Sequence, residues 1–599
     1  MIAQVAYSPG MGARLFGCAL GLGLLAGAAP AAASCVLQKY AELPVTIENG
    51  GAVTTAKLNG ADTRLIVDTG AFFSMLDPST VEKYGLKTGF LPPNITVSGV
   101  AGEADVKLTR VKEVTVLGVP LHGVDFLVGE HFTGADGLLG QNLLSLMDTE
   151  FDFAQGAIRL MKPEGCGDAA LAYWNQGSTS SGAMSIDPIE PPNSKIIGSV
   201  TINGVKLRAV FDTGAHRSIL SLGGARRAGV KMNDAGVMPG GALLGVGRSI
   251  TETWIAPFSL VDIGGEQIKN TRLRVADVSL AEADMLIGAD FFLSHRIYVS
   301  KSQRKLYFTY NGGPVFNLDV QAPQASSPVP ATPASAAVAP TPSPDQPADS
   351  AGYTRRGDVF FARGEYASAI ADFGRAAELE PGEAQHFYDR ARARLENRQP
   401  LPALGDLDQA LKLKPDDAAA LALRGEVRLF EKNDAGAKAD FDAALSRDPS
   451  LRLRVASAYA RAQRFEEALA HYDLWIASHP KNEDLATPLS GRCWMRALWG
   501  RDLDKALADC NEALKLWPGA PQVLGSRGLA FLRLGQPDKA IADYDAALKV
   551  EPRFAWSLYG RGLARHQKGL TAAGDADIAA ALAIAPAIAA EAKQHGVGR

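Results

Sequence analysis

The chain of 599 residues is too long for a single hydrophobic core, which predicts three or more domains. Its 61 Lys and Arg residues against 65 Asp and Glu residues give a net charge of −4, with no basic block that would bind nucleic acid or an anionic membrane surface. We therefore expect peptides or proteins as partners, and no nucleic acid.

Residues 1–34 have the pattern of an export signal. Arg14 supplies a positive charge, Leu15 to Ala29 form an apolar stretch, and Ala31-Ala32-Ala33-Ser34 matches a small-residue cleavage site. The apolar stretch is rich in Gly and Ala and short for a bilayer span, so a retained membrane anchor is the less favoured alternative. We expect a bacterial protein that is periplasmic or secreted, with no membrane span after the signal is removed.

The cysteines agree with an oxidising compartment. Of the 5 cysteines, Cys18 lies in the export signal, which leaves an even number in the mature chain. Lipid modification of Cys35 is an alternative, but the residues before it lack the leucine usual three places upstream. The candidate disulfide cysteines are Cys35, Cys166, Cys493 and Cys510.

A tripeptide occurs twice in the first half of the chain. Asp68-Thr69-Gly70 and Asp212-Thr213-Gly214 each follow an apolar run and are followed by an alanine, Ala71 or Ala215. An aspartate that ends a strand before Thr-Gly lies on a tight loop, where glycine lets the backbone amides approach the carboxylate. We interpret the two loops as a pair.

The surroundings of the tripeptide are duplicated with it. Asn59-Gly60 and Asn203-Gly204 begin nine residues before the respective aspartates, and Asn-Gly between alternating segments predicts a β-hairpin. Leu138-Leu139-Gly140 ends 72 residues after the first aspartate, and Leu286-Ile287-Gly288 ends 76 after the second. The whole block is therefore duplicated.

Both halves are predicted to be mostly β-structure. Residues 95–102 and 243–247 combine apolar residues with glycine, which is typical of hairpins with glycine-rich tips. Each half ends in a further pair of strands, so we expect one small closed β-unit per half. These terminal strands are 151–153 with 157–160, and 296–299 with 305–308.

Residues of about 40–163 and 190–312 each resemble a retropepsin-like aspartic protease domain. Retroviral proteases use this unit as a homodimer, and pepsin-like enzymes use it as two fused lobes. The resemblance is specific because two motifs occur in register, each with its apolar-apolar-glycine partner, and it extends to bacterial exported proteins that join such domains to helical repeats. The matching segments are 68–71 with 138–142, and 212–215 with 286–290.

The resemblance implies a catalytic dyad of Asp68 and Asp212. Two carboxylates held close together cannot both ionise, so they share one proton. The ionised member takes a proton from the attacking water and the protonated member donates to the scissile carbonyl oxygen, so neither a metal nor a cofactor is required. By resemblance, the hydroxyls of Thr69 and Thr213 lock the loops together and the neighbouring amides bond the carboxylates. The loop-support residues are Thr69, Gly70, Ala71, Thr213, Gly214 and Ala215.

Two differences bear on the cleft. The glycine-rich segments fit substrate-covering flaps but lack the tyrosine of pepsin-like flaps, which favours retropepsin-like detail. After the motifs, Phe72-Phe73 in the first half stands against His216-Arg217 in the second, which predicts an asymmetric cleft in which His216 is a pocket or surface residue and not a catalytic one. The candidate flap residues are Gly99, Gly102, Gly245 and Gly247.

The composition changes from Gly312 to Ser350, where Pro, Ala and Ser dominate. Such a segment cannot bury a core and its prolines keep it extended, so it is predicted to be a spacer.

Beyond the spacer, a set of residues recurs with a period of 34. Small residues at fixed offsets let two antiparallel helices approach closely, and a proline ends the second helix. This set resembles the tetratricopeptide repeat (TPR) family, with about seven copies and a capping tail, and the resemblance implies a concave surface that binds a peptide or protein partner. A purely structural or oligomerising array is the alternative. The first copy contains Gly357, Ala369, Phe373, Ala376 and Pro381.

The repeat positions also suggest disulfide pairings. Cys493 and Cys510 fall on facing helices of the fifth copy, close enough for a bridge if both side chains point inward. Cys35 and Cys166 stand at the two ends of the first duplicated block, so we expect them to form the second bridge.

We predict an all-β retropepsin-like pseudo-dimer followed by an all-α TPR solenoid. The predicted function is that of an exported aspartic endopeptidase that recruits a partner or substrate through its repeats. The alternatives are a non-catalytic periplasmic TPR adaptor with pseudoprotease domains, and an enzyme whose halves pair between two chains. The predicted segments are a signal peptide (1–34), the two retropepsin-like halves (35–168 and 185–311), the linker (312–350) and the TPR array (351–599).

Overall fold

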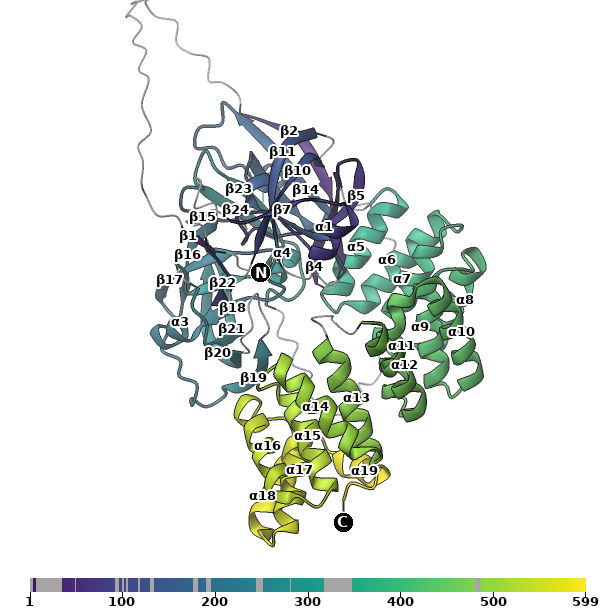
Figure 1. The fold of residues 1–599 in the computed structure, drawn as a ribbon. Helices are drawn as coiled ribbons and strands as arrows, with labels where there is room; N and C mark the ends of the chain where they lie inside the picture. Colours follow the sequence, from purple (N-terminus) through teal and green to yellow (C-terminus); the bar gives the residue numbers. More distant parts are fainter. Residues whose placement is uncertain are drawn as a thin grey trace, which may run out of the picture. The chain divides into compact units, whose positions relative to one another are not determined.

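The computed structural model forms two compact units, one mainly β and one α-helical (Figure 1). The first comprises Met1–Met238, Leu243–Leu318 and Asp358–Glu365, and the second Pro239–Ala242, Asp319–Gly357 and Tyr366–Arg599. The predicted fold class is therefore confirmed. The structure describes residues 4–6, 35–48, 50–91, 96–99, 102–103, 106–116, 119–129, 134–175, 181–189, 195–243, 251–280, 282–316, 347–479 and 485–598.

The two halves of the first unit are built on similar sheets. In the first half the strand order is β3-β4-β5-β12-β6-β11-β10-β7, and in the second it is β16-β17-β22-β18-β21-β20-β19. The first sheet consists of β3 (Thr46–Glu48), β4 (Gly51–Leu58), β5 (Ala61–Val67), β6 (Met75–Leu76), β7 (Thr88–Gly89), β10 (Lys107–Val116), β11 (Val119–Val128) and β12 (Gly137–Leu139). The second consists of β16 (Ile196–Ile202), β17 (Val205–Phe211), β18 (Ile219–Ser221), β19 (Met238–Leu243), β20 (Thr251–Ile263), β21 (Glu266–Ala276) and β22 (Met285–Ile287).

Short helices follow the strands of both halves at matching places. In the first half, α1 (Pro78–Lys83) and α2 (Gln141–Leu144) correspond to α3 (Leu222–Arg227) and α4 (Ala289–Ser294) in the second. Each of α2 and α4 begins directly after the glycine of the apolar-apolar-glycine segment.

The predicted Asn-Gly hairpins are present. Both central residues of each turn have positive φ, 50° and 87° for Asn59-Gly60 and 49° and 81° for Asn203-Gly204, as a type I′ turn requires. The turns join β4 to β5 and β16 to β17, so the second arm of each hairpin ends directly before an aspartate. The strand that precedes each aspartate lies parallel to the later apolar-apolar-glycine strand of its half, with Val67 opposite Leu139 and Phe211 opposite Ile287.

The terminal strands of the halves differ from the expectation of one closed unit per half. They combine in a six-stranded sheet of order β15-β24-β23-β13-β14-β2, in which β13 of the first half pairs with β23 of the second. Each terminal hairpin leaves one edge without a partner, and the other half supplies it. The strands are β2 (Val36–Pro44), β13 (Asp148–Asp152), β14 (Ala157–Glu164), β15 (Ser181–Ser185), β23 (His295–Ser300) and β24 (Lys305–Tyr310).

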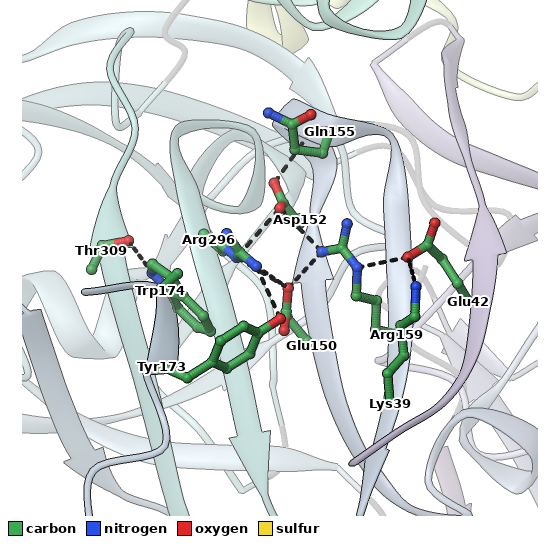
Figure 2. A network of polar contacts seen from close by, with 10 residues as sticks. All are labelled: Lys39, Glu42, Glu150, Asp152, Gln155, Arg159, Tyr173, Trp174, Arg296 and Thr309. Atoms are coloured by element: carbon green, nitrogen blue, oxygen red, sulfur yellow. Dashed lines mark hydrogen bonds and ion pairs between the residues drawn. The ribbon is translucent and has the colours of Figure 1, made fainter. Parts of the chain in front are cut away.

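A buried ion network lies on this shared sheet (Figure 2). The side chain of Glu150 on β13 is fully buried and forms ion pairs with Arg159 on β14 at 2.6 Å and with Arg296 on β23 at 2.8 Å. Asp152 lies within 3.2 Å of Arg159 and 3.3 Å of Arg296, and the Trp174 ring covers the Arg296 guanidinium with a centroid distance of 4.3 Å. Residues of both halves therefore neutralise one another inside the same sheet.

Aromatic packing also joins the halves. Phe151 of the first half meets Phe292 of the second edge to face, with ring centroids 5.4 Å apart, and both are buried in the same hydrophobic core. Phe211, which directly precedes the second aspartate, packs against Phe291 at 5.8 Å. The core beneath the two aspartate loops is thus continuous from one half to the other.

The glycine-rich segments are only partly described. A three-stranded sheet contains β1 (Gln4–Ala6), β8 (Thr96–Gly99) and β9 (Gly102–Glu103), and Gly99 is paired with Gly102. Gly245 and Gly247, and the predicted signal peptide apart from Gln4–Ala6, lie outside the described residues.

The second unit consists of paired antiparallel helices with a short terminal helix. Gly357 and Gly425 allow close packing, because a Cβ on either would lie 2.6 Å from the ring of Phe373 or Phe441. The residues of α5 (Ser350–Ala362) from Asp358 onward belong to the first unit. The other helices are α6 (Tyr366–Leu379), α7 (Ala384–Glu396), α8 (Pro400–Leu413), α9 (Ala418–Phe430), α10 (Asp434–Arg447), α11 (Arg452–Arg461), α12 (Phe465–Ser478), α13 (Ala486–Trp499), α14 (Leu503–Leu516), α15 (Pro521–Arg533), α16 (Pro537–Val550), α17 (Ala555–Gln567), α18 (Thr571–Ile584) and α19 (Ile588–Gln594).

The repeats also carry an ion-pair ladder that the sequence analysis missed. An arginine on the first helix of a pair forms two hydrogen bonds with an aspartate on the second, as Arg390 does with Asp406 at 3.0 and 2.6 Å. Val455 and His471 occupy the corresponding positions of the fourth pair, which follows the third at a spacing of 31 residues. The other pairs are Arg356–Asp372, Arg424–Asp440, Arg492–Asp509, Arg527–Asp543 and Arg561–Asp577.

Two disulfides are present, Cys35–Cys166 and Cys493–Cys510, which are the two expected pairings. Cys493 and Cys510 are fully buried between α13 and α14. Among the described helices, none alone has the length and apolar composition to cross a membrane, and α18 with α19 meets that criterion only when the two are taken together across a 106° bend.

Candidate active site

The two Asp-Thr-Gly loops place their carboxylates in the interior of the first unit. Asp68 and Asp212 follow the ends of β5 and β17, and both residues are fully buried. The amides of Gly70 and Ala71 each donate to Asp68 Oδ1 at 2.9 Å, and the amide of Gly214 donates to Asp212 Oδ1 at 2.9 Å. The tight turn after each strand thus orients its own carboxylate.

A reciprocal threonine network joins the loops. The Thr69 hydroxyl donates to the Phe211 carbonyl at 2.9 Å and accepts from the Thr213 amide at 2.9 Å. The Thr213 hydroxyl donates to the Val67 carbonyl at 2.7 Å and accepts from the Thr69 amide at 3.1 Å. Each hydroxyl is therefore fixed by the backbone of the other half.

The loops approach so closely that glycine is required after each threonine. A Cβ on Gly70 would lie 2.3 Å from Asp212 Cγ, and a Cβ on Gly214 would lie 2.3 Å from Asp68 Cγ. Burial, together with the neighbouring Asp212 carboxylate, raises the pKa of Asp68 from 3.8 to about 8. The pair therefore retains a proton at neutral pH.

A serine that the sequence analysis missed supports each loop from behind. Ser74 Oγ accepts from the Gly140 amide at 3.0 Å and donates to Asn142 Oδ1 at 2.8 Å. In the second half, Ser218 Oγ accepts from the Gly288 amide at 3.0 Å and donates to Asp290 Oδ1 at 2.7 Å. The signal was available, because both serines lie six residues after their aspartate.

The apolar-apolar-glycine segments brace the loops through backbone contacts. The Gln141 amide donates to the Ala71 carbonyl at 2.9 Å, and the Ala289 amide donates to the Ala215 carbonyl at 2.7 Å. A Cβ on Gly140 would lie 2.7 Å from the backbone carbon of Phe73, which explains the glycine at this position.

The candidate residues divide into those at the dyad and those away from it. The loop-support residues surround the carboxylates, whereas Gly99 and Gly102 belong to the separate β8–β9 hairpin and the cysteines lie elsewhere in the chain. In the parts of the chain that the structure describes, no group of three or more His, Cys, Asp or Glu side chains is arranged to hold a metal ion.

Two buried aspartates on paired loops, joined by reciprocal threonine bonds, form the arrangement of aspartic proteases, and family models agree. Residues 54–143 match the model described as aspartyl protease, and residues 198–294 match the gag-polyprotein putative aspartyl protease. Residues 354–400, 388–450 and 433–483 match the tetratricopeptide repeat, and 528–569 match a further TPR repeat model. The chain therefore contains two aspartyl protease domains followed by TPR repeats, as the sequence predicted.

More distant similarities cover parts of the chain. An uncharacterized protein in the cobV 5′ region of Sinorhizobium sp. is 28% identical over 128 residues, which span 21% of this chain and 55% of that protein. A tetratricopeptide repeat protein from Parabacteroides merdae is 20% identical, with a TM-score of 0.31, over 37% of this chain and 86% of its own. The C-terminal part of a TPR repeat-containing protein from Cytophaga hutchinsonii is 18% identical, with a TM-score of 0.31, over 39% of this chain and 95% of its own.

Proposed function

We propose that the protein is an exported aspartic endopeptidase whose two halves form one active site. The observation that carries this proposal is the close approach of two buried carboxylates, Asp68 and Asp212, from opposite halves of one chain. Burying two acids side by side costs free energy, and a binding scaffold has no use for them. A proton-sharing dyad needs both.

In the proposed mechanism a water molecule is activated between the two carboxylates. The ionised carboxylate removes a proton from the water while the water oxygen forms a bond to the scissile carbonyl carbon. The protonated carboxyl donates its proton to the carbonyl oxygen. The carbon–nitrogen bond then breaks as the leaving amine takes a proton from the dyad. The Asp68 and Asp212 carboxylates supply both roles, and the amides of Gly70 and Gly214 hold them in position.

Pairing of the halves within one chain is favoured over pairing between two chains. The threonine network, the β13–β23 ladder and the Glu150–Arg296 ion pair all connect the halves of a single chain. A dimer with exchanged halves would form the same three contacts between two chains, whereas a single chain already forms all of them within itself.

Export and recruitment complete the proposal. Two disulfides suit an oxidising compartment outside the cytoplasm. TPR arrays generally bind peptides or proteins, so we assign the repeats to binding a substrate or partner protein.

The test is the separate replacement Asp68→Asn and Asp212→Asn. Because both carboxylates serve one dyad, we expect each variant to lose at least about 100-fold in kcat/KM on a cleavable peptide and to keep a native circular dichroism spectrum. Asp62→Asn, which neutralises an aspartate whose side chain is 69% exposed, is the matched control and should retain wild-type activity.

Retention of about half the activity in either single variant would contradict a shared site. If the wild-type protein cleaves no peptide or protein between pH 3 and 9 yet captures a partner through its repeats, the adaptor alternative holds instead.

A further inference from the structure

The pseudo-symmetry of the first unit assigns an equivalent in the other half to each residue around the dyad. Ile219 takes the place of Met75, because each lies seven residues after its aspartate. Met75 pairs with Leu127 in the β6–β11 ladder and Ile219 pairs with Arg274 in the β18–β21 ladder, so Arg274 takes the place of Leu127.

The neighbouring strands extend the equivalence by two residues. Leu108 lies opposite Leu127, and Ile255 lies opposite Arg274. Residues two positions apart on a strand share one face, so Thr253 takes the place of Val106.

On the first-half side these positions form an apolar cluster. Val106 and Leu127 are buried together with Met75, and Phe73 and Leu91 pack against them. Phe72, beside Phe73, meets its ring edge to face at a centroid distance of 4.5 Å. This side of the dyad carries apolar and aromatic side chains.

On the second-half side the equivalent positions are basic and polar. Arg274 is 6% exposed, and its Nη1 donates to Thr253 Oγ1 at 2.8 Å. Burial and the nearby charge of Arg217, which takes the place of Phe73, lower the pKa of Arg274, whereas Asp290 opposes the shift. Asp290 takes the place of Asn142 of the first half, so the second half has both an arginine and a carboxylate where the first half has neither.

Two further basic residues of the second half lie within electrostatic range of Asp212. Lys195 takes the place of Gly51, and His216 takes the place of Phe72. A Cβ on Gly51 would lie 3.5 Å from His216 Nε2, so the imidazole reaches the first half. The Asp212 carboxylate acts electrostatically on both Lys195 and His216.

The charge difference between the sides is therefore systematic. Gly51, Phe72, Phe73 and Leu127 carry no charge, whereas Lys195, His216, Arg217 and Arg274 are all basic. Glu282 interacts electrostatically with Lys195, and Asp290 with Arg274. When His216 is neutral, the three cations Lys195, Arg217 and Arg274 therefore exceed these two carboxylates by one formal charge.

We propose that the second half forms a subsite for an acidic side chain of the substrate, and the first half a subsite for a large apolar one on the other side of the scissile bond. This inference rests on the proposed peptidase function, since it assigns the substrate class of that same cleft. An extended peptide that crosses the dyad meets the two halves on opposite sides of its scissile bond, and partly desolvated cations favour a carboxylate over an amide.

The experiment compares cleavage of peptide pairs that differ only by Glu or Gln at each position flanking the scissile bond. For the wild-type protein we expect kcat/KM to be about tenfold higher for Glu at one position on a single side, and to be highest for Phe or Leu on the other side. Raising the salt concentration should reduce the Glu preference, because the interaction is electrostatic.

The test variants replace residues of the second half with the residue types found at the equivalent positions of the first half. Arg217→Phe and the double variant Arg274→Leu/Thr253→Val should reduce the ratio of Glu to Gln cleavage to about one. Because Arg274 is buried and its replacement can disturb folding, Lys195→Gln serves as a second probe at a half-buried position and should reduce the same ratio at least threefold. Lys206→Gln, at an exposed lysine of β17, is the control and should leave the ratio unchanged.

The outcomes separate this inference from the proposed function. If the wild-type protein cleaves peptides in an Asp68-dependent way but shows no Glu preference, or if folded Lys195→Gln and Arg217→Phe proteins keep that preference, the acidic subsite is overturned and the peptidase stands. If no peptide is cleaved at all, both are overturned.

Discussion

At the scale of single residues, the site depends on the distance between two loops. A methyl group at Gly70 or Gly214 would occupy the space of the opposite carboxylate, so the dyad can form only with glycine at both positions. The hydroxyls of Thr69 and Thr213 then fix that distance, because each bonds to two backbone groups of the other half. A change at either threonine should move the opposite aspartate.

The pH dependence of activity should reflect the raised pKa of Asp68. Since the mechanism needs one protonated carboxyl, kcat/KM should fall above the Asp68 pKa of about 8. A pH profile of kcat/KM on a neutral peptide measures this. Loss of activity already above pH 5, in protein that remains folded, would contradict the assignment.

The same group couples stability to pH. Between pH 3.8, the ordinary pKa, and about 8, the unfolded chain has released the Asp68 proton while the folded protein retains it. Unfolding therefore releases a proton, and the free energy of unfolding should fall as pH rises through this window, by up to about 1.4 kcal/mol per pH unit. Asp68→Asn should flatten this slope in urea unfolding experiments.

At the scale of secondary-structure elements, the shared sheet holds the halves together. The β13–β23 ladder places Glu150 opposite Tyr298, and the two arginines that neutralise Glu150 come from different halves. The association of the two halves therefore depends on the buried Glu150 carboxylate and its two arginine partners (Figure 2).

Glu150→Ala should destabilise the first unit by about 3–5 kcal/mol, because it leaves Arg159 and Arg296 buried without their main counter-charge. Chemical unfolding followed by tryptophan fluorescence measures the loss. Glu164→Gln, which removes a charge from an ion pair whose carboxylate side chain is 55% exposed, should leave the unfolding midpoint close to that of the wild-type protein. Equal effects of the two replacements would mean that the network contributes no more than a surface pair.

Local motifs explain how far the sequence could be interpreted. The aspartate loops, the Asn-Gly turns and the 34-residue helical period depend on residues close together in the chain, so their spacing alone predicted them. The Glu150 network and the exchange of Leu127 for Arg274 depend on which strands become neighbours and in what register. Register is set by packing over a whole sheet, and the pattern of one strand alone does not contain it.

The shared terminal sheet illustrates the same limit. Residues 151–153 and 296–299 were predicted as strands from their alternation, and they lie in or beside β13 and β23. However, the alternation of apolar residues does not determine which strand becomes the neighbour. Here β13 of the first half pairs with β23 of the second. The candidate dyad was predictable because its motif occurs twice, whereas the residues that distinguish its two sides became evident only from the ladders.

At the scale of the whole molecule, the first unit extends into the beginning of the repeat region. Val359 is buried in its hydrophobic core, and Arg363 Nε donates to the Leu293 carbonyl at 3.0 Å. The predicted boundary at residue 351 would cut this segment, Asp358–Glu365, away from the unit to which it belongs. A truncation that tests the repeats should therefore end after Glu365.

Removing residues 366–599 should leave cleavage of short peptides within about twofold of the full-length rate, because a short peptide needs only the dyad and its flanking subsites. Cleavage of the natural protein substrate should weaken by about tenfold or more, mainly through KM, because a protein bound to the repeats is held near the cleft at a raised local concentration.

The measurement is kcat/KM for both substrate types, in full-length protein, in a chain that ends after Glu365, and in one that ends after Leu318. The shortest chain also lacks Val359 and Arg363, so it should lose stability and activity on both substrates. Equal losses on the two substrates in the chain ending after Glu365 would mean that the repeats stabilise the protease unit, and recruitment would then be excluded as their main role.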